Sequence, residues 1–419
     1  MLKQINIIRI AMMIVIVIVA AIYIPDFYWK TNKYEANKTN VYYSPVSKSF
    51  VLLKSDVRGV VYTDPNGKIY SRDDFEQLVP FLNFRQLMAT GKMPDSLSGI
   101  AIIPKEINKN NIQFRINPGG INSRPLQLYP LIESKSGRVR LELPPDYFRI
   151  TDRMEFVTSQ TNEINQEKSE LFTNALKKQG FKFPSKFIYG NPSTKKLFDE
   201  GYFVIDNGNN VFHIKMVKGK PFCKKTQIPS DLEIAYMAIN ETELREFYGM
   251  IATKKNEAYL ISYKNYELIK LPVEEYNYQD HTLLLRGDLF YRTIIVSNES
   301  GLKAVITDKN YNVIDKYSET KPTKEEKLAG TIASYLFPFT IETEKATTPF
   351  INFYFNFSDA RSLILTFVML AVSFLYLRKK NLSLLKVTPY YVLVLLTGVY
   401  GLIALLIIRD FDDDPSESK

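Results

Sequence analysis

The chain has 419 residues and a formal net charge of +9, and 45% of its residues are hydrophobic, including 27 Tyr and 27 Phe. This length allows one large domain or two ordinary ones together with membrane spans, and the apolar content suffices for a sizeable core. The single cysteine, Cys223, excludes an internal disulfide, and His213 and His281 lie far apart and belong to no metal-spaced cluster. Lysines and arginines are mixed with acids along the chain, so the charge predicts a solvated basic face and no nucleic-acid partner. We expect no metal and no cofactor.

An apolar segment opens the chain and predicts a membrane helix. Residues 5–24 give about twenty residues, enough to span a bilayer if Arg9 extends to the interface. The run resembles a signal peptide, but Ile22–Asp26 is a poor cleavage site. The sequence therefore favours an uncleaved signal anchor at residues 1–24 over a cleaved peptide, with Phe27–Trp29 as an aromatic belt at the interface.

Residues 25–180 predict a mixed α/β part of a large extracytoplasmic domain. Ser71 is a predicted helix N-cap, with Asp73-Asp74 suited to the first turn and Pro80 ending or kinking the helix. A second helix is predicted at Asn162–Gln179. The predicted strands are Ser49–Lys54, Gly59–Thr63, Ile100–Ile103, Ile112–Ile116 and Val139–Leu143, and Asp64–Gly67 is a predicted hairpin turn.

Residues 181–345 contain a repeat of about 45 residues, each unit with four short strands. This period and strand count are typical of a β-propeller blade, although a β-sandwich or an unclosed meander fits as well. Three blades cannot close a ring, so residues 40–158 and Thr331–Glu342 would have to supply the rest. The predicted strands are 186–189, 202–206, 211–216 and 220–226 in the first unit, 233–239, 247–253, 257–263 and 266–271 in the second, and 281–286, 291–297, 302–308 and 311–317 in the third. Asp206 and Asp308 are interpreted as structural turn residues at equivalent strand ends, with Thr253 in the second unit.

Two apolar runs near the C-terminus predict a transmembrane hairpin at residues 362–408. Ser362–Leu377 and Val387–Ile408 carry no charge, and only helices satisfy their own backbone hydrogen bonds in lipid. The short connection 378–386 carries four cations, Arg378, Lys379, Lys380 and Lys386. Because clustered cations in short loops stay in the cytoplasm, these four residues are predicted to determine the topology.

The predicted topology has three passes through the bacterial cytoplasmic membrane, so lipid is the first predicted partner. The N-terminus lies inside, the large domain is periplasmic, and the acidic tail 409–419 lies outside. An aromatic juxtamembrane segment at 346–361 leads into the hairpin. In the last span Thr397, Gly398 and Gly401 are small residues, and they are predicted to permit close helix packing.

Two segments of the large domain resemble an uncharacterised family of Bacteroidota membrane proteins, a domain of unknown function. The residues concerned are Tyr62, Asp64–Lys68, Tyr70-Ser71, Phe75 and Phe84–Leu87 within 59–95, and Asn191–Thr194 with Asp199–Phe203. The family defines no catalytic residues. Its genes lie beside those of ABC transporters, so the resemblance implies a membrane-protein partner of that class and a transport-linked accessory role.

Motifs of common enzymes are missing from the sequence. It contains no Gly-x-Ser-x-Gly, Walker or His-Glu-x-x-His pattern, and Cys223 has the setting of a packed strand residue rather than a nucleophile. The pairs Glu274-Glu275 and Asp73-Asp74 are interpreted as solvated turn and helix-start residues. We predict a non-catalytic, membrane-anchored interaction protein of the cell envelope. Two alternatives stay open: an envelope hydrolase that uses paired carboxylates, and a propeller that binds a small ligand or glycan.

Overall fold

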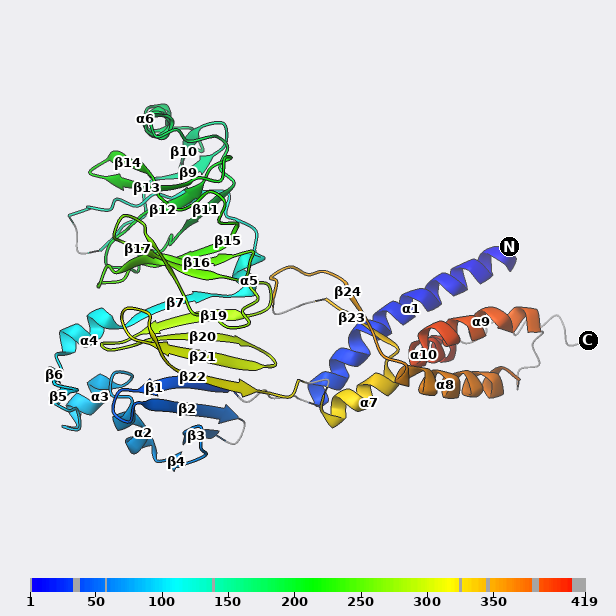
Figure 1. Ribbon diagram of the computed structural model, residues 1–419. Helices are drawn as coiled ribbons and strands as arrows, with labels where there is room; N and C mark the ends of the chain where they lie inside the picture. The colour runs from blue at the N-terminus through cyan, green and yellow to red at the C-terminus, as the bar shows by residue number, and fades with distance from the viewer. Residues whose placement is uncertain are drawn as a thin grey trace, which may run out of the picture. The chain divides into compact units, whose positions relative to one another are not determined.

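The computed structural model is mainly β and divides into two compact units, which we call the sheet unit (Asn37–Thr320) and the helical unit (Met1–Ala36 with Lys321–Lys419). Figure 1 shows the sheets and the helices that cover them. The structure describes residues 2–32, 38–56, 59–137, 140–323, 326–343, 347–378 and 384–408.

The sheet unit is built from antiparallel sheets in which consecutive strands pair. Three sheets are four-stranded: β1 (Lys38–Ser44), β2 (Ser49–Asp56), β3 (Gly59–Thr63) and β4 (Ile69–Tyr70); β11 (Phe187–Gly190), β12 (Tyr202–Ile205), β13 (Val211–Val217) and β14 (Lys220–Lys225); β15 (Ile234–Ile239), β16 (Phe247–Thr253), β17 (Ala258–Ser262) and β18 (Leu268–Lys270). A fifth strand, β7 (Ile112–Ile116), joins β19 (Thr282–Gly287), β20 (Arg292–Asn298), β21 (Gly301–Thr307) and β22 (Val313–Thr320). Smaller sheets contain β8 (Tyr129–Pro130), β9 (Asp146–Ile150) and β10 (Met154–Thr158), and β5 (Ser96–Leu97) with β6 (Ile100–Ala101).

The larger sheets stack face to face because successive residues of a strand point to opposite sides. In β12, Tyr202 and Val204 pack in the cluster shared with β8–β10, whereas Phe203 and Ile205 pack against β15–β18. Burying one large apolar side chain stabilises a fold by roughly 1.5–3 kcal/mol, so each interface contributes substantially. The same alternation separates Met250 from Ile251 in β16, Ile294 from Ile295 in β20, and Leu52 from Val51 in β2.

Helices cover the two ends of this stack (Figure 1). At one end α6 (Gln166–Lys178) packs Phe172 and Leu176 into the cluster of β8–β10 and β11–β14. At the other end α2 (Arg72–Leu78) packs Phe75 against Val51 of β2. The remaining helices of the unit are α3 (Phe84–Ala89), α4 (Pro104–Asn110) and α5 (Pro118–Ile121). Among the described residues, no hydrophobic cluster joins the sheet β1–β4 at one end to the sheet β8–β10 at the other. The stack is therefore open and does not close into a ring.

All twelve strands predicted for the repeat are found, each within a few residues of the predicted bounds. The predicted ring is not seen among the described residues, and the open stack corresponds to the unclosed-meander alternative. The first sheet, β1–β4, lies beside the last repeat unit, and Thr39 Oγ1 donates a 3.2 Å hydrogen bond to Glu319 near the unit's two ends. Residues Leu328–Leu336 are helical and belong to the other unit, so Thr331–Glu342 supplies no blade.

The first part of the sheet unit was predicted less completely. Ser71 caps α2 as expected, since its Oγ accepts from Asp74 N at 3.1 Å. The predicted strand Val139–Leu143 is wrong: residues 140–143 form no strand, and Val139 lies outside the described residues. The second helix begins at Gln166 rather than Asn162, because Asn165 is the cap and accepts from Lys168 N at 3.1 Å.

The turn residues also need one correction. Asp206 follows β12 and its Oδ1 accepts from the backbone N–H groups of Gly208 and Asn210, both at 2.8 Å. Thr253 occupies the same connection in the second unit. Asp308 follows β21 and therefore lies one connection later, so it is not equivalent to Asp206, although its carboxylate holds a turn of the same kind.

The helical unit packs around one apolar core. It contains α1 (Leu2–Thr31), α7 (Leu328–Leu336), the hairpin β23 (Phe339–Glu342) and β24 (Tyr354–Phe357), α8 (Arg361–Arg378), α9 (Leu384–Thr397) and α10 (Val399–Ile407). Its core includes Ala21 of α1, Phe337 after α7, Leu377 of α8 and Tyr400 of α10. The predicted last span, Val387–Ile408, is not one continuous helix, because it breaks at Gly398 between α9 and α10.

Candidate functional site

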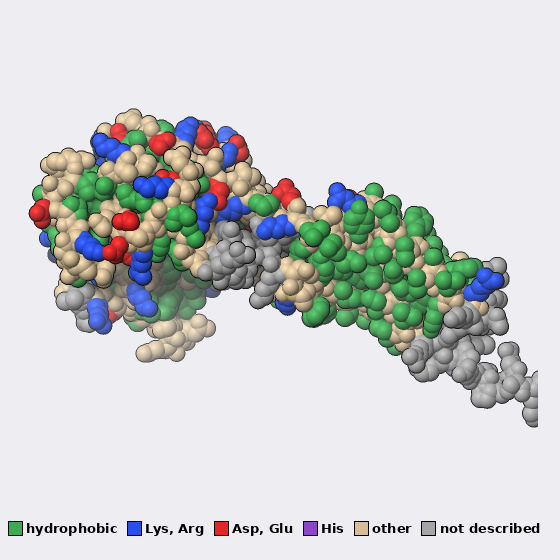
Figure 2. Space-filling view, turned by 90° about the horizontal axis from the view of Figure 1, so that it is seen from below, with side chains coloured by type: hydrophobic (Ala, Val, Ile, Leu, Met, Phe, Trp, Pro, Cys, Tyr) green, Lys and Arg blue, Asp and Glu red, His purple; other side chains and the backbone are tan. Residues whose placement is uncertain are grey.

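The helical unit exposes an unusually apolar surface. Helix residues Ile7–Thr31 and Arg361–Arg378 are long and apolar enough to cross a membrane by length and composition. At about 1.5 Å per residue, an 18-residue helix is about 27 Å long, close to the hydrocarbon thickness of a bilayer. Hydrophobic side chains cover most of the visible face of this unit in Figure 2, whereas cations and acids are interspersed over the sheet unit. Exposed large side chains include Ile7, Ile8, Met12, Val15 and Tyr23 of α1, and Leu363, Ile364, Phe367 and Leu375 of α8.

Side-chain contacts define two ends of the helical unit. Near the start of α1, Arg9 Nη1 donates to Tyr390 Oη of α9 at 3.4 Å. Arg9 is buried, so it does not extend outward alone as the sequence suggested. Near the other end of α1, Tyr28 Oη donates to Ala329 O of α7 at 2.7 Å. The N-terminal end of α1 therefore lies beside Tyr390 in the first half of α9, and its C-terminal end lies with α7.

The four residues predicted to determine topology lie at the first of these ends as far as the structure describes them. Arg378 is the last residue of α8. Lys379 and Lys380 lie outside the described residues, and so does the side chain of Lys386, whose backbone belongs to the first turn of α9. Their effect on orientation stays a prediction.

The three predicted packing residues surround the helix break. Gly398 has φ of 57°, and a Cβ there would lie 3.0 Å from Thr366 Oγ1 of α8 and 3.1 Å from Pro338 Cγ. Gly398 therefore permits both the turn and a close approach between segments. At Gly401 a Cβ would meet Thr397 Oγ1 at 2.5 Å and Val394 Cα at 2.9 Å, so this glycine lets the end of α9 and the start of α10 approach each other, and its role in packing against other helices stays a prediction. These residues build an elbow between α9 and α10.

In the sheet unit, a lysine is buried with two carboxylates where two neighbouring sheets meet. Lys196 lies in the β11–β12 connection, and its Nζ donates to Asp199 Oδ1 at 2.5 Å and to Glu241 Oε1 at 2.6 Å. The third proton is directed to Asn191 O at 2.7 Å, so the ammonium is saturated. The side chain of Lys196 is 3% exposed, and those of both acids are 1% exposed. We call these four residues the ionic latch.

The acids of the ionic latch are held by further backbone and side-chain donors. Glu241 accepts from Asn191 Nδ2 at 2.9 Å and from Glu200 N at 3.2 Å, and Asp199 accepts from Gly201 N at 3.0 Å. Burial raises the pKa of the Asp199 carboxyl to about 6, against the opposing effect of Lys196. Glu241 belongs to the β15–β16 connection. The latch therefore links the sheet β11–β14 to the neighbouring sheet β15–β18.

A second buried cation links the sheet β15–β18 to the sheet that contains β19–β22. Arg292 of β20 is 1% exposed in its side chain and donates from Nη2 to Glu246 Oε2 at 2.7 Å. Its Nη1 donates to Asp288 O at 2.8 Å and Tyr291 O at 3.0 Å. Buried ion pairs repay their desolvation only when geometry and hydrogen bonding are good. The ammonium of Lys196 meets this condition with three acceptors, whereas Arg292 Nε has no hydrogen-bond partner among the described residues. Charged links therefore join the sheet β15–β18 to both of its neighbours, and Glu241 and Glu246, which make these links, both lie in the β15–β16 connection.

His213 lies in an aromatic setting beside the ionic latch. Its ring stacks on Phe203 with centroids 4.6 Å apart. Nε2 lies 2.5 Å from Glu200 O, which only accepts, so Nε2 carries the proton and Nδ1 accepts from Tyr266 Oη at 2.9 Å. Burial lowers the pKa of His213 to about 3, so the ring is neutral at neutral pH. His213 is a satisfied core residue. Among the residues that the structure describes, no group of three or more His, Cys, Asp or Glu could hold a metal ion.

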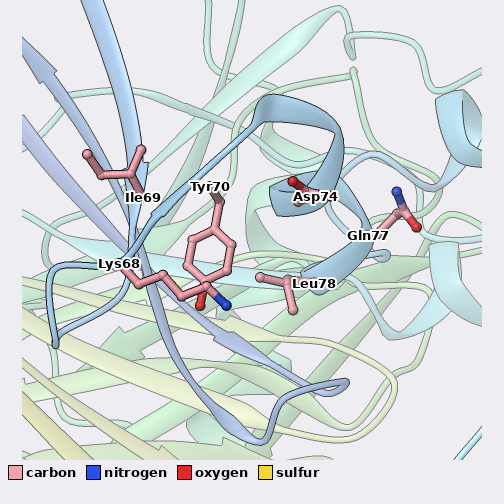
Figure 3. A pocket seen from close by; sticks show the side chains of 6 residues that line it. All are labelled: Lys68, Ile69, Tyr70, Asp74, Gln77 and Leu78. Atoms are coloured by element: carbon pink, nitrogen blue, oxygen red, sulfur yellow. The ribbon is translucent and has the colours of Figure 1, made fainter.

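An open groove of about 460 Å³ lies between β4 and α2 at one end of the stack (Figure 3). Its lining combines polar and apolar side chains: Lys68, Ile69, Tyr70, Asp74, Gln77 and Leu78. Lys68 Nζ lies 4.9 Å from the centre of the Tyr70 ring, and Asp74 Oδ2 accepts from Ser71 Oγ at 2.7 Å. This volume falls in the range of small-molecule sites.

Sequence reasoning missed the ionic latch and the groove. The family resemblance touches both, since 59–95 contains the groove and Asn191–Thr194 with Asp199–Phe203 contains two of the four latch residues, Asn191 and Asp199. No local pattern could pair Lys196 with Glu241, because 45 positions separate them. The resemblance was the one signal that pointed to these segments.

The stacked sheets and the helical unit define a β-rich protein with apolar helices of membrane-spanning length. A family model described as a domain of unknown function, DUF4857, matches residues 40–307, more than half of the chain. The chain belongs to this family, which confirms the predicted domain of unknown function, while the bacterial group and the transporter association stay predictions. The match begins in β1 and ends in β21, so it covers the sheet stack and none of the helical unit. No curated protein matches the chain.

Proposed function

We propose that this protein is a membrane-anchored accessory protein of the bacterial cell envelope, with the helical unit in the cytoplasmic membrane and the sheet unit in the periplasm. The observation that carries the proposal is the exposed apolar surface of α1 and α8. In water this surface would be unfavourable at roughly 25 cal/mol per Å², whereas lipid tails are as apolar as the side chains. A membrane removes this cost without any change in fold.

The proposed orientation follows the distribution of cations. The start of α1 lies beside the first half of α9, and in the sequence the cations of 378–386 stand at the end of α8 and the start of α9. Placing these cations in the cytoplasm agrees with the positive-inside rule. We propose three passes, the third in broken form. Helix α9 returns toward β23, and Tyr400 of α10, just after the break, donates from Oη to Phe339 O of β23 at 2.8 Å. The C-terminus would then lie outside.

The geometry of the sheet unit favours an interaction protein over a hydrolase. A glycosidase-type pair needs two carboxylates that reach a bound substrate. Asp199 and Glu241 are close together, but Lys196 lies between them and none of the three is accessible. Glu274 and Glu275 each pair with a lysine at the surface. The ionic links between sheets stiffen the stack, and a stiff surface suits a binding partner because less conformational freedom is lost on association. A transporter subunit contacting the helical unit is the partner class we favour.

Cysteine accessibility tests the orientation. Burial raises the pKa of the only native thiol, Cys223, to about 12, so the wild-type background is low. Lys316→Cys places a thiol on exposed β22, and Asn381→Cys places one in the basic connection. In intact spheroplasts a membrane-impermeant maleimide should label Lys316→Cys alone, and lysis should expose Asn381→Cys. If Asn381→Cys alone is labelled before lysis, the proposed orientation is wrong and the sheet unit lies on the cytoplasmic side.

Cross-linking in native membranes tests the accessory role. A photoactivatable residue in place of Phe367 on α8, 61% exposed, should yield a covalent adduct with another membrane protein. The same residue in place of Phe187, 44% exposed on β11, samples the sheet unit. Absence of any protein adduct from either unit would contradict the accessory role while leaving the membrane anchor intact.

The groove of Figure 3 favours a second candidate function, the binding of a small polar ligand. Its mixed lining offers the Lys68 ammonium and the Gln77 amide beside the apolar Ile69 and Leu78. A thermal-shift screen with oligosaccharides and small anions should then raise the melting temperature of the wild-type protein. The rise should disappear in Gln77→Ala, and a screen without any rise would remove this candidate.

A further inference from the structure

The segment before α8 exposes a row of large apolar side chains on one strand face. Residues 347–358 contain no charged residue. Within them Ile351, Phe353, Phe355 and Phe357 are 74%, 66%, 60% and 81% exposed. They recur at every second position, so an extended chain presents them on one side. Four such exposed apolar side chains form a patch that is unfavourable in water, and patches of this kind mark binding surfaces.

The register of the hairpin shows how this patch continues from the core of the helical unit. Phe355 of β24 pairs with Ile341 of β23, and Phe357 pairs with Phe339. Directly paired residues share a face of the sheet. Ile341 is buried in the helical core and Phe339 packs against it, so β24 extends the same apolar face sideways beyond the helices.

Helix α7 adds a second apolar stripe in the same unit. Leu328, Ile332 and Tyr335 are 77%, 44% and 38% exposed, at spacings of four and three residues along one helix face. The opposite face buries Ala333 against the helical core. Helix α7 lies at the end of the unit where Tyr28 contacts Ala329, which is the end proposed to face the periplasm.

We propose that β24, its preceding residues from Ile351, and the exposed stripe of α7 lie in the outer interface of the bilayer as a separate lipid contact. The inference rests on the membrane anchoring proposed above and adds the lipid interface as the surface that these residues bind. Aromatic side chains are favoured at that depth because their rings are apolar yet tolerate nearby water. The hydrocarbon core is excluded for the hairpin, since a two-stranded sheet leaves the outer edges of both strands unpaired.

Lipid suits this surface better than a protein groove. The patch is followed in the chain by the exposed face of α8, whose Leu363 and Ile364 are themselves proposed to face lipid. The residues between are Ser358–Arg361, whose Asp359 and Arg361 form an ion pair of 3.4 Å and mark the polar level of the interface. The partner is therefore the zwitterionic and anionic headgroup region of the same membrane.

Tryptophan fluorescence in vesicles tests the proposal with the full-length chain. Trp29 is the only native tryptophan, so Trp29→Phe gives a silent background. Phe355→Trp in that background is reconstituted into phosphatidylcholine–phosphatidylglycerol vesicles that carry bromines near the headgroup or near the chain ends. We expect a blue-shifted emission and about two-fold stronger quenching by the shallow bromines than by the deep ones. Phe353→Trp, two residues away on the same face, should behave alike.

Two matched variants separate the possible failures. Phe367→Trp on α8 must be quenched if the anchor is in the membrane, and Phe187→Trp on β11 must not be. If Phe355→Trp and Phe353→Trp are quenched no more than Phe187→Trp while Phe367→Trp is quenched, the interfacial contact is wrong and the anchor stands. Stronger quenching of Phe355→Trp by the deep bromines also overturns the interfacial depth. If Phe367→Trp is unquenched, the membrane anchor itself fails.

Discussion

Replacing Lys196 by methionine should destabilise the sheet unit strongly. The ammonium of Lys196 is the partner that Asp199 and Glu241 share, and all three side chains are at most 3% exposed. Methionine keeps the length of the side chain but leaves two carboxylates buried without their cation. Removing one member of a buried ion pair costs about 3–5 kcal/mol, because the remaining charge stays desolvated.

Pulse proteolysis in urea measures this loss on the full-length protein in detergent. For a unit of this size the dependence of the unfolding free energy on urea is about 3 kcal/mol per molar, so the midpoint should fall by about 1–1.7 M. Lys270→Met is the matched control, since Lys270 pairs with Glu257 at 2.5 Å but is 61% exposed. Its midpoint should stay close to that of the wild type, because exposed pairs contribute little.

The pH dependence gives a second, independent readout. Burial raises the pKa of Asp199 from 3.8 to about 6, so between these values the native state holds a proton that the unfolded state has lost. Stability from this group is fully present below about pH 4 and is lost as the pH rises through about 6. Removing the Lys196 cation raises the pKa of Asp199 further. The defect of Lys196→Met should therefore be smaller at about pH 5 than at about pH 7.5.

Two results would refute this reasoning. One is a midpoint for Lys196→Met as close to the wild type as that of Lys270→Met, which would mean that water reaches the latch. The other is a defect that does not shrink on acidification. Lys196→Met combined with Asp199→Asn and Glu241→Gln removes all three charges, and it should recover part of the lost stability.

Three further predictions concern single positions. Gly201→Ala should cost about 2–5 kcal/mol in pulse proteolysis, because φ is +71° and a Cβ would lie 2.1 Å from Ile214 O, whereas Gly219→Ala, with the same φ and open space, should cost only about 1–2 kcal/mol. Ser71→Ala should lower stability by about 1 kcal/mol through loss of the helix cap. Cys223 should resist a maleimide at neutral pH in the native protein and react after denaturation, and rapid native labelling would contradict its buried setting.

Local pattern predicted the sheet repeat well, for a physical reason. The inner strands of the repeat bury their alternating sides against different neighbours, so strands such as β12 and β16 read as continuous apolar runs between polar turns. Such runs are visible in the sequence one strand at a time. The placement of β7 beside β19 was not visible, because the two strands are far apart in the chain and no turn connects them.

The candidate sites were predictable only in part, because their partners are distant in sequence. The four cations of 378–386 are a local pattern, but Lys196 with Glu241, and Arg292 with Glu246, depend on sheets stacking in one particular order. The break at Gly398 was missed for a related reason: a glycine within an apolar run is as compatible with helix packing as with a turn. The contact with Thr366 and Pro338 decides between them.

The open stack and the apolar surface of the helical unit differ in what they need for stability. A closed ring satisfies both faces of every sheet, whereas an open stack must cover its two end faces, and here α2 and α6 do so with Phe75 and Phe172 buried. The two end faces of the sheet unit are therefore covered by the unit's own helices. The helical unit differs, since its exposed apolar surface is stable only when something apolar covers it. If the membrane supplies that cover, as proposed, a variant of the ionic latch should weaken the sheet unit without releasing the protein from the membrane.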